Sequence, residues 1–363
     1  MGFDYVSRLE RVTEAMHRYE VDTLLLSVGA DMPWLFGYGA MALERVTMAI
    51  VRPGTTPVLV VPELEAPRVD DHGGVFDVVA WGELEDPIGI IADRVGTGVA
   101  IAMGDQTWTT FTLALQGRLG GRTWESAGPI MADMRMVKED EELDRLRTAG
   151  ASADRVAARL ANYSFGGKTE RHVATDIAAM LIEEGHDTTW DVIVASGRNG
   201  ASPHHGPGDR VIRAGDPIVC DFGGTMAGYT SDTTRNFVVG TPPPEYLDMF
   251  SVLMEAQEAG VRAATVGTPC REVDRVTRNV IENAGYGEFF VHRTGHGIGL
   301  EVHEAPYIVE GNDLPLAPGM AFSVEPGIYI PGRFGMRIED IVIATDHGPQ
   351  RCNNSTRDLV IVE

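Results

Sequence analysis

Two segments of the sequence place acidic residues inside apolar runs that read as β-strands. The first is PIVCDFGGTMAGYTSDTTRNFVVG (217–240), where a glycine-rich turn separates an apolar run from a β-branched run. A hairpin turn centred on Met226 and Ala227 places Asp221 opposite Asp232, with their Cβ atoms about 5 Å apart. The segment therefore predicts two carboxylates that face each other across neighbouring strands.

The second segment is AFSVEPGIYIPGRFGMRIEDIVIAT (321–345), in which a turn centred on Gly332 places Glu325 opposite Glu339. Like charges that face each other are destabilising, and burial increases the cost. Either one acid of a pair stays protonated, or divalent cations neutralise the cluster. One such pair is typical of a solvated strand face, whereas two pairs beside glycine-rich turns favour a site with a chemical role.

Histidines are concentrated near the same segments. His292, His296 and His303 occur in HRTGHGIGLEVHE, and His204 and His205 are adjacent in ASPHHGPGDR. Glycines flank His296, which predicts a loop whose backbone can approach a bound group closely. Imidazole suits zinc, cobalt and manganese, and carboxylates suit manganese and magnesium. A site of four carboxylates and one histidine would therefore accept manganese, cobalt or zinc.

The first third of the chain reads as a small α/β domain. Apolar periodicity predicts a helix over 4–20, and short apolar runs predict strands over 21–29 and 95–102. A strand pair over 48–62 turns at Pro53-Gly54. Residues 125–137 are interpreted as a connection, with a domain boundary near residue 135.

Long helices and glycine-rich strands alternate in the remainder. Helices are predicted over 139–160, 170–184, 245–264 and 269–284. Thr169 would cap the second of these and Gly185 would end it. Thr268 would cap the last helix, with Pro269 as its first residue.

The composition excludes several classes of protein. The 363 residues suit two domains, and a net charge of −23 argues against nucleic acid or an anionic membrane as a partner. Cys220, Cys270 and Cys352 form no CxxC pair, so we expect no disulfide framework and a cytoplasmic location. The N-terminal segment lacks the apolar core of a signal peptide, and no run of about 18 uncharged apolar residues predicts a membrane span.

Five segments carry a resemblance to a known family: NGASPHHGPGDRVI (199–212), DFGGTMAGYTSDTTR (221–235), HRTGHGIGLEVHE (292–304), SVEPGIY (323–329) and MRIED (336–340). Over 137–363 the sequence resembles the metal-dependent "pita-bread" peptidases, peptidase family M24. The first domain resembles the creatinase-type N-terminal domain of the proline-specific branch. The resemblance implies an α/β (α+β) protein with a creatinase-like domain over 1–135. A pita-bread catalytic domain over 136–363 would follow, with a curved antiparallel sheet covered by helices.

By position, the resemblance implies that Asp221 holds one divalent ion and that His296 and Glu325 hold the other. Asp232 and Glu339 would bridge both ions. His204 and His303 would contact the substrate and stabilise the reaction intermediate. His292 would line the substrate pocket, and Arg337 would lie beside the bridging glutamate as a further substrate-binding residue.

The implied activity is hydrolysis of Xaa-Pro bonds by a hydroxide that bridges two ions, manganese being preferred, with Glu325 as proton shuttle. An Xaa-Pro dipeptidase (prolidase) that acts on small peptides with proline second is the leading hypothesis. An Xaa-Pro aminopeptidase (aminopeptidase P) is the alternative. A hydrolase or lyase of the same fold with a non-peptide substrate, and a non-catalytic binding protein, are further alternatives. The resemblance also suggests a homodimer.

Overall fold

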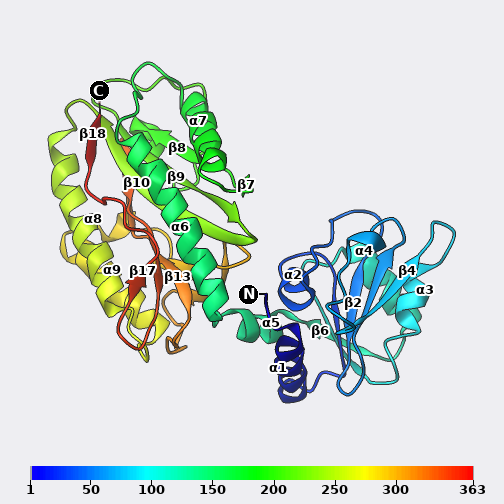
Figure 1. The fold of residues 1–363 in the computed structure, drawn as a ribbon. Coiled ribbons are helices and arrows are strands. Elements are labelled where there is room, and N and C mark those ends of the chain that lie inside the picture. Colours follow the sequence, from blue (N-terminus) through cyan, green and yellow to red (C-terminus); the bar gives the residue numbers. More distant parts are fainter. Residues whose placement is uncertain (1, 363) are drawn as a thin grey trace. The chain divides into compact units, whose positions relative to one another are not determined.

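The computed structural model describes residues 2–362. They belong to two compact units, one that ends at Arg135 and one that begins at Met136 (Figure 1). Each unit has its own β-structure and its own apolar core. Within residues 2–362, no helix is both long enough and apolar enough to cross a membrane.

The first unit is built on one mixed six-stranded sheet, in the order β4-β3-β2-β1-β5-β6. Its strands are β1 (Thr23–Leu26), β2 (Met48–Val51), β3 (Val58–Pro62), β4 (Asp77–Trp81), β5 (Ala100–Met103) and β6 (Thr123–Ser126). Leu25, Ile50, Val60 and Ile101 are buried in its core because alternate side chains of these strands face the helices. The predicted strands over 21–29, 48–62 and 95–102 contain β1, the β2–β3 pair and part of β5.

Five α-helices belong to this unit: α1 (Tyr5–Arg18), α2 (Asp31–Phe36), α3 (Pro87–Ala92), α4 (Thr109–Arg118) and α5 (Gly128–Arg135). A single 3-10 turn occupies Ala66–Arg68. The Asp4 side chain caps α1 by accepting a hydrogen bond from the Ser7 N–H. Residues 125–137, interpreted as a connection between the domains, include the end of β6 and the helix α5, which buries Ile130 and Met131.

Two five-stranded sheets and a separate hairpin make up the second unit. The first sheet holds β7 (Thr188–Thr189), β8 (Ile193–Ser196), β9 (Pro217–Met226), β10 (Tyr229–Val239) and β18 (Val360–Val362). The second holds β11 (Gly295–Gly297), β12 (Glu304–Ile308), β13 (Ala321–Val324), β16 (Asp340–Ile343) and β17 (Gln350–Arg351). The hairpin consists of β14 (Gly327–Ile330) and β15 (Phe334–Arg337). The strand orders are β18-β10-β9-β7, with β8 beside β9, and β12-β11-β13-β16-β17.

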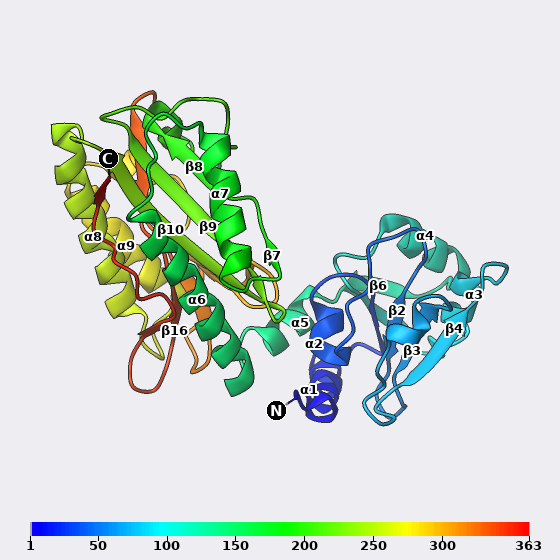
Figure 2. The same ribbon diagram turned by 45° about the horizontal axis from the view of Figure 1, so that its top comes forward.

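Four long helices cover these strands (Figure 2). They are α6 (Asp140–Leu160), α7 (Glu170–Glu183), α8 (Pro244–Ala263) and α9 (Cys270–Asn283). α6 and α7 pack on β8, β9 and β10, where Val156, Ile177 and Phe237 share one core. α8 and α9 pack on each other, α8 also on β13 and α9 on β12. All four helices were predicted from the sequence, the first from its apolar face and the second and fourth from their terminal residues.

The ends of these helices follow local chemistry. Glu139 and Glu142 form a capping box at the start of α6, and Thr169 caps α7 by accepting from the His172 N–H. Gly185 follows α7 with φ 106°, which suits glycine. The predicted start of the last helix is wrong by one residue. Pro269 occupies the cap position with φ −61° and ψ 141°, and α9 begins at Cys270.

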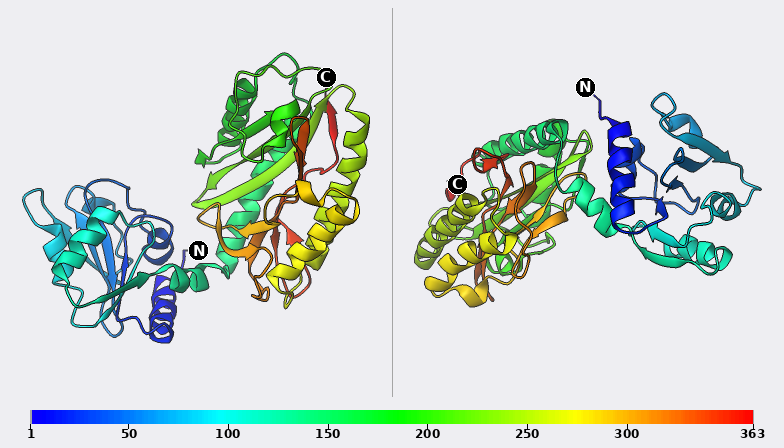
Figure 3. Two further views of the ribbon diagram at one scale, coloured as in Figure 1. Left: turned by 180° about the vertical axis from the view of Figure 1, so that it is seen from behind. Right: turned by 90° about the horizontal axis from the view of Figure 1, so that it is seen from below.

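The β9–β10 hairpin differs from its predicted register. Its two-residue turn is Ala227-Gly228, with φ 49° and 85°, so Asp221 lies opposite Thr234 and Asp232 lies opposite Gly223. Positive φ at both turn residues matches the right-handed twist of the long strands, which Figure 3 shows from behind. Because the register shift is two residues, Asp221 and Asp232 still share one face, diagonally rather than directly opposed.

The register predicted for 321–345 is confirmed. Val324 pairs with Asp340 in one sheet, and Gly327 pairs with Arg337 in the separate hairpin. Glu325 and Glu339 lie between these two pairs. Glu325 connects β13 to β14, and Glu339 lies where β15 leads into β16. The two acids are therefore next to each other at a break in the pairing.

Substitutions of Ala227 can test the conformation of the β9–β10 turn. The residue has φ 49°, which costs a non-glycine residue about 1–2 kcal/mol. Asp187 Oδ2 accepts from its N–H at 2.8 Å and Arg145 Nη1 donates to its carbonyl at 2.9 Å, which holds the turn in place. Ala227→Asn should raise the melting temperature by about 2–4 °C, since Asn tolerates this conformation.

The matched control is Ala227→Val, whose β-branched side chain is strained at positive φ. We expect this variant to melt below the wild type in the same calorimetric scan. A stabilised Val variant, or a destabilised Asn variant, would show that the turn has a different conformation in solution.

Candidate metal centre

The five predicted metal ligands come from five different places in the second unit. Asp221 is on β9, Asp232 on β10 and His296 on β11, whereas Glu325 follows β13 and Glu339 lies between β15 and β16. All five line one cavity of about 320 Å³. Its wall also includes Trp190, Asp191, Val192, Ile193, His204, His205, Gly206, Pro207, Val302, His303 and Arg337. The structure therefore brings the predicted set together.

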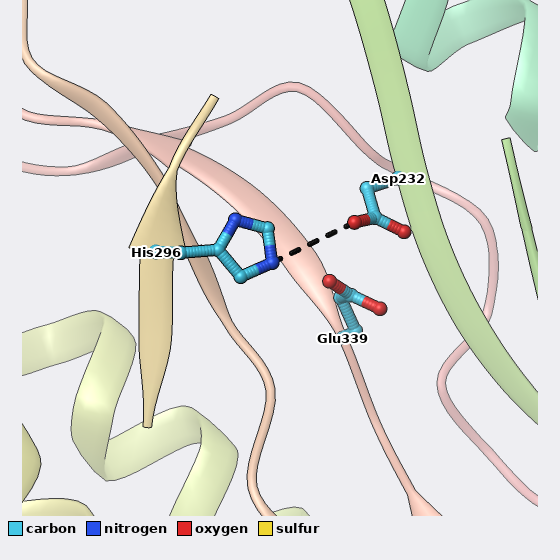
Figure 4. Close-up of side chains that lie close together, drawn as sticks. All are labelled: Asp232, His296 and Glu339. Atoms are coloured by element: carbon cyan, nitrogen blue, oxygen red, sulfur yellow. Dashed lines mark ion pairs between the residues drawn. The ribbon is translucent and has the colours of Figure 1, made fainter. Parts of the chain in front are cut away.

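Three of these side chains form the tightest group. Asp232, His296 and Glu339 each offer one ligand atom, and these atoms lie within 4.8 Å of one another (Figure 4). His296 Nε2 is 3.7 Å from Asp232 Oδ2 and 3.1 Å from Glu325 Oε1. All three members of the group are buried. Such a group of donors matches the size and composition of a cation site.

His296 is oriented by its own backbone. Its Nδ1 lies 3.1 Å from the Gly297 carbonyl, so Nδ1 carries the proton and Nε2 faces the carboxylates. The backbone N–H of His296 donates to Ser323 Oγ, and that hydroxyl donates to Glu325 Oε1, both at 3.0 Å. A nitrogen lone pair directed at carboxylate oxygens is unfavourable unless a proton or a cation lies between them.

The glycines beside His296 have a different role from the one expected. They belong to β11 rather than to a loop. A Cβ at Gly295 would lie 1.9 Å from the Ser323 carbonyl oxygen, and one at Gly297 would lie 2.2 Å from the Ala305 carbonyl oxygen. Glycine is required because the neighbouring strands approach this closely, and that approach fixes the position of the imidazole.

Burial and mutual repulsion govern the electrostatics of the acids. Burial, then the charges of Asp221 and Glu325, raise the pKa of Asp232 well above its usual range. Burial and the charge of Asp232 do the same to the pKa of Glu339. Among the described residues, Glu339 Oε1 is buried without a hydrogen-bond partner. A divalent cation at this position would reduce the repulsion and satisfy that oxygen, so the residues present fit a divalent metal site.

Glu325 behaves differently from Asp232 and Glu339. Burial opposes its ionisation, but the hydrogen bond and the charge of His296 outweigh this and lower its pKa to about 2. Glu325 is therefore a carboxylate at neutral pH. A negatively charged oxygen at the edge of the group can accept a proton.

Arg337 supplies positive charge behind the acids. Its Nη2 donates to Asp221 Oδ2 at 2.5 Å, its Nε to Thr234 Oγ1 at 3.0 Å and its Nη1 to the Tyr329 hydroxyl at 3.1 Å. The guanidinium offsets part of the effect of burial, which still raises the pKa of Asp221. These contacts are within the protein, and the expected contact with substrate stays a prediction.

The adjacent histidines His204 and His205 have different environments. His205 Nε2 lies 2.9 Å from Glu170 Oε2, whereas His204 is exposed on the cavity wall. The sequence left open which of them belongs to the site, and this arrangement favours His204. His303 packs edge-on against His296 with ring centroids 4.1 Å apart. Burial and the charge of His296 lower the pKa of His303 to about 4.

The expected place of His292 in the substrate pocket stays a prediction. Among the described residues it is not part of the wall of this cavity. Its Nδ1 lies 2.7 Å from the Arg293 carbonyl and its Nε2 lies 2.9 Å from the Tyr329 hydroxyl. The ring therefore supports Tyr329, which in turn contacts Arg337.

Two residues of the centre were missed in the sequence. Thr234 Oγ1 lies 3.0 Å from Asp221 Oδ1 and 2.7 Å from Glu339 Oε2, so this hydroxyl separates two acids. Tyr329 connects His292 to Arg337. Thr234 lies two positions after Asp232 and thus on the same strand face, which is the signal that could have identified it.

Comparison with known proteins agrees with this geometry. Residues 144–346 match the model of metallopeptidase family M24, and residues 8–137 match the creatinase/prolidase N-terminal domain. The chain is 43% identical to the probable dipeptidase PepE of Mycobacterium tuberculosis, over 99% of this chain and 96% of that protein. It is 34% identical to an Xaa-Pro dipeptidase of Lactobacillus helveticus, over 98% of each chain.

A solved structure resembles the chain over its whole length. The prolidase from Thermococcus sibiricus superposes with a TM-score of 0.95 at 34% identity, and the alignment covers 100% of both chains. The family match covers more than half of the residues, and the relatives align from end to end. The chain therefore belongs to metallopeptidase family M24, with a creatinase-like N-terminal domain followed by a pita-bread catalytic domain.

Proposed function

We propose that this protein is an Xaa-Pro dipeptidase that uses two divalent metal ions. The observation that carries the proposal is the buried group of Asp232, His296 and Glu339, with Glu325 3.1 Å from the histidine. The names of the relatives, a probable dipeptidase and an Xaa-Pro dipeptidase, support the substrate class.

In this proposal Asp221 would hold one ion, His296 and Glu325 would hold the other, and Asp232 and Glu339 would contribute to both sites. Four carboxylates for one imidazole form a hard, oxygen-rich donor set, which favours manganese over zinc or cobalt. Two bound divalent ions would lower the pKa of a water molecule and polarise the scissile carbonyl.

Glu325 is the proton carrier. As a carboxylate 3.1 Å from His296 on the cavity wall, it can take a proton from the attacking water and pass it to the leaving nitrogen. The nitrogen of an Xaa-Pro bond belongs to a tertiary amide and carries no hydrogen. It can depart as an amine only after it receives a proton, which is why an acid close to that atom is needed.

His303 and His204 are the groups that contact the substrate. With a pKa of about 4, His303 is neutral at physiological pH and offers one N–H to the oxygen on which negative charge develops. His204 is exposed on the wall of the same cavity and can reach the peptide from there. Contacts of His292 and Arg337 with substrate remain predictions, as do a homodimeric assembly and a cytoplasmic location.

The substrate preference can be measured directly. With manganese added, the protein should cleave Ala-Pro with kcat/KM about tenfold or more above Ala-Pro-Ala, because a dipeptidase requires the carboxylate of a two-residue substrate. Ala-Ala is the control for the proline requirement. Faster cleavage of Ala-Pro-Ala would identify an aminopeptidase instead. Failure to cleave any proline peptide with metal bound would point to a non-peptide substrate.

Asp232→Asn tests the metal assignment. The substitution removes the charge of a proposed bridging ligand, so activity on Ala-Pro should fall by at least about 100-fold. Metal content, measured by mass spectrometry after dialysis, should fall with it. The matched control is Asp209→Asn, since Asp209 is exposed and pairs with Arg171. Equal metal content in the two variants would contradict the assignment.

Metal should also stabilise the fold. Manganese at 100 times its Kd adds about 2.7 kcal/mol to the stability of a protein with one site. For a unit of this size we expect the melting temperature of chelator-treated wild type to rise by about 5–10 °C when manganese is restored. Glu339→Gln should abolish most of that rise. A wild-type melting temperature that is unaffected by manganese would exclude the proposed centre.

A further inference from the structure

Glu170, the first residue of α7, is a fully buried acid that the proposed reaction does not use. Its carboxylate accepts hydrogen bonds from one continuous stretch of chain, residues 196–208. The donors are Ser196 N at 2.8 Å, Ser196 Oγ at 2.7 Å, Asn199 Nδ2 at 3.0 Å, His205 Nε2 at 2.9 Å and Gly208 N at 3.3 Å. One side chain therefore holds both ends of the segment and two points within it.

The Glu170 carboxylate is ionised, and donors within the protein use all of its capacity to accept hydrogen bonds. Burial favours the neutral acid, but the hydrogen bonds from Ser196, His205 and Asn199 outweigh burial and place the pKa of Glu170 below its usual value. An ionised carboxylate offers about four lone-pair positions, and five donors surround this one. Glu170 thus acts within the protein, and the segment that it holds is what it affects.

Residues 196–208 have two further attachments. Gly200 lies against Gly335 of β15 so closely that a Cβ at Gly335 would be 1.9 Å from the Gly200 carbonyl oxygen. The Pro203 carbonyl accepts from Arg337 Nη1 at 3.1 Å, and Arg337 also contacts Asp221. His204 stands between the tethered residues Pro203 and His205, and it is exposed on the cavity wall.

We propose that Glu170 is a positioning residue that fixes His204 at the metal centre through His205 and the backbone of residues 196–208. The proposal rests on the proposed function, in which His204 contacts the substrate. It gives three residues of NGASPHHGPGD a common role, since Asn199, His205 and Gly208 all donate to the same acid.

Glu170→Gln tests the proposal. The amide removes the negative charge and directs an N–H2 group at existing donors, so the segment should loosen. We expect kcat/KM for Ala-Pro to fall on the order of 100-fold, the cost of displacing a catalytic group by about 1 Å. The control is Glu142→Gln, in which a buried acid of α6 that accepts from Tyr229 is changed in the same way. Activity should stay within about threefold of wild type in that control.

A double-mutant cycle separates positioning from general damage. In a His204→Ala background, Glu170→Gln should cost no more than about twofold, because the group that it positions is already absent. A full additional 100-fold loss in that background would overturn the proposal.

If the Glu170 variant does not fold, His205 provides a second test. His205→Gln keeps a donor near Nε2 and should retain activity, whereas His205→Leu should lose it. Equal activity of these two variants would also overturn the proposal.

Hydrogen exchange gives a readout that does not depend on activity. Backbone amides of residues 196–208 should exchange faster in Glu170→Gln than in the wild type, with α8 and α9 unchanged. Unchanged exchange in the segment would overturn the positioning role. If the wild type fails to cleave Ala-Pro, the proposed function fails, and the exchange measurement still decides the role of Glu170.

Discussion

Carboxylates that repel one another must be held within a few ångströms where little water screens them. Asp221, Asp232 and Glu339 are each less than a tenth exposed, and burial is the largest cause of the raised pKa at all three. No local propensity favours this arrangement, because each acid would be better solvated apart from the others. The packing of the rest of the second unit keeps these acids close together despite their repulsion, which bound cations would neutralise.

The acids are held together by their strands, which strand pairing and helix packing outside the site keep in place. Asp221 and Asp232 are on β9 and β10, which form ten residue pairs and against which α6 and α7 pack. Glu325 and Glu339 lie at a shared break between two sets of paired strands, so neither can move without breaking pairs on both sides. Thr234 and Arg337 then occupy the space between the acids as donors and limit the number of charges that face each other unscreened.

Much of this was predictable from sequence, and the failures have identifiable causes. The pairing of Glu325 with Glu339 was predicted correctly because Pro331-Gly332 leaves little choice of turn. The β9–β10 register was wrong by one turn position, since an alanine at φ 49° is not expected where glycines are available nearby. His296 was identified as a site residue, but the need for its flanking glycines was not. That need arises from contacts with Ser323 and Ala305, which only the folded sheet brings close.

Residues that position other site residues could not be predicted from the sequence, because their contacts also form only in the folded protein. Glu170 is 26 residues from Ser196 and 35 from His205, and neither spacing marks a motif. Arg235 is a second case. Its Nη1 donates to the carbonyls of Thr234 and Glu339, at 3.0 and 2.7 Å, and its Nη2 pairs with fully buried Asp340. A cation that binds the backbone carbonyls of two site residues holds these residues without contact with their side chains. Repulsion among the acids is thus resisted through the main chain as well as by the side-chain donors Thr234 and Arg337.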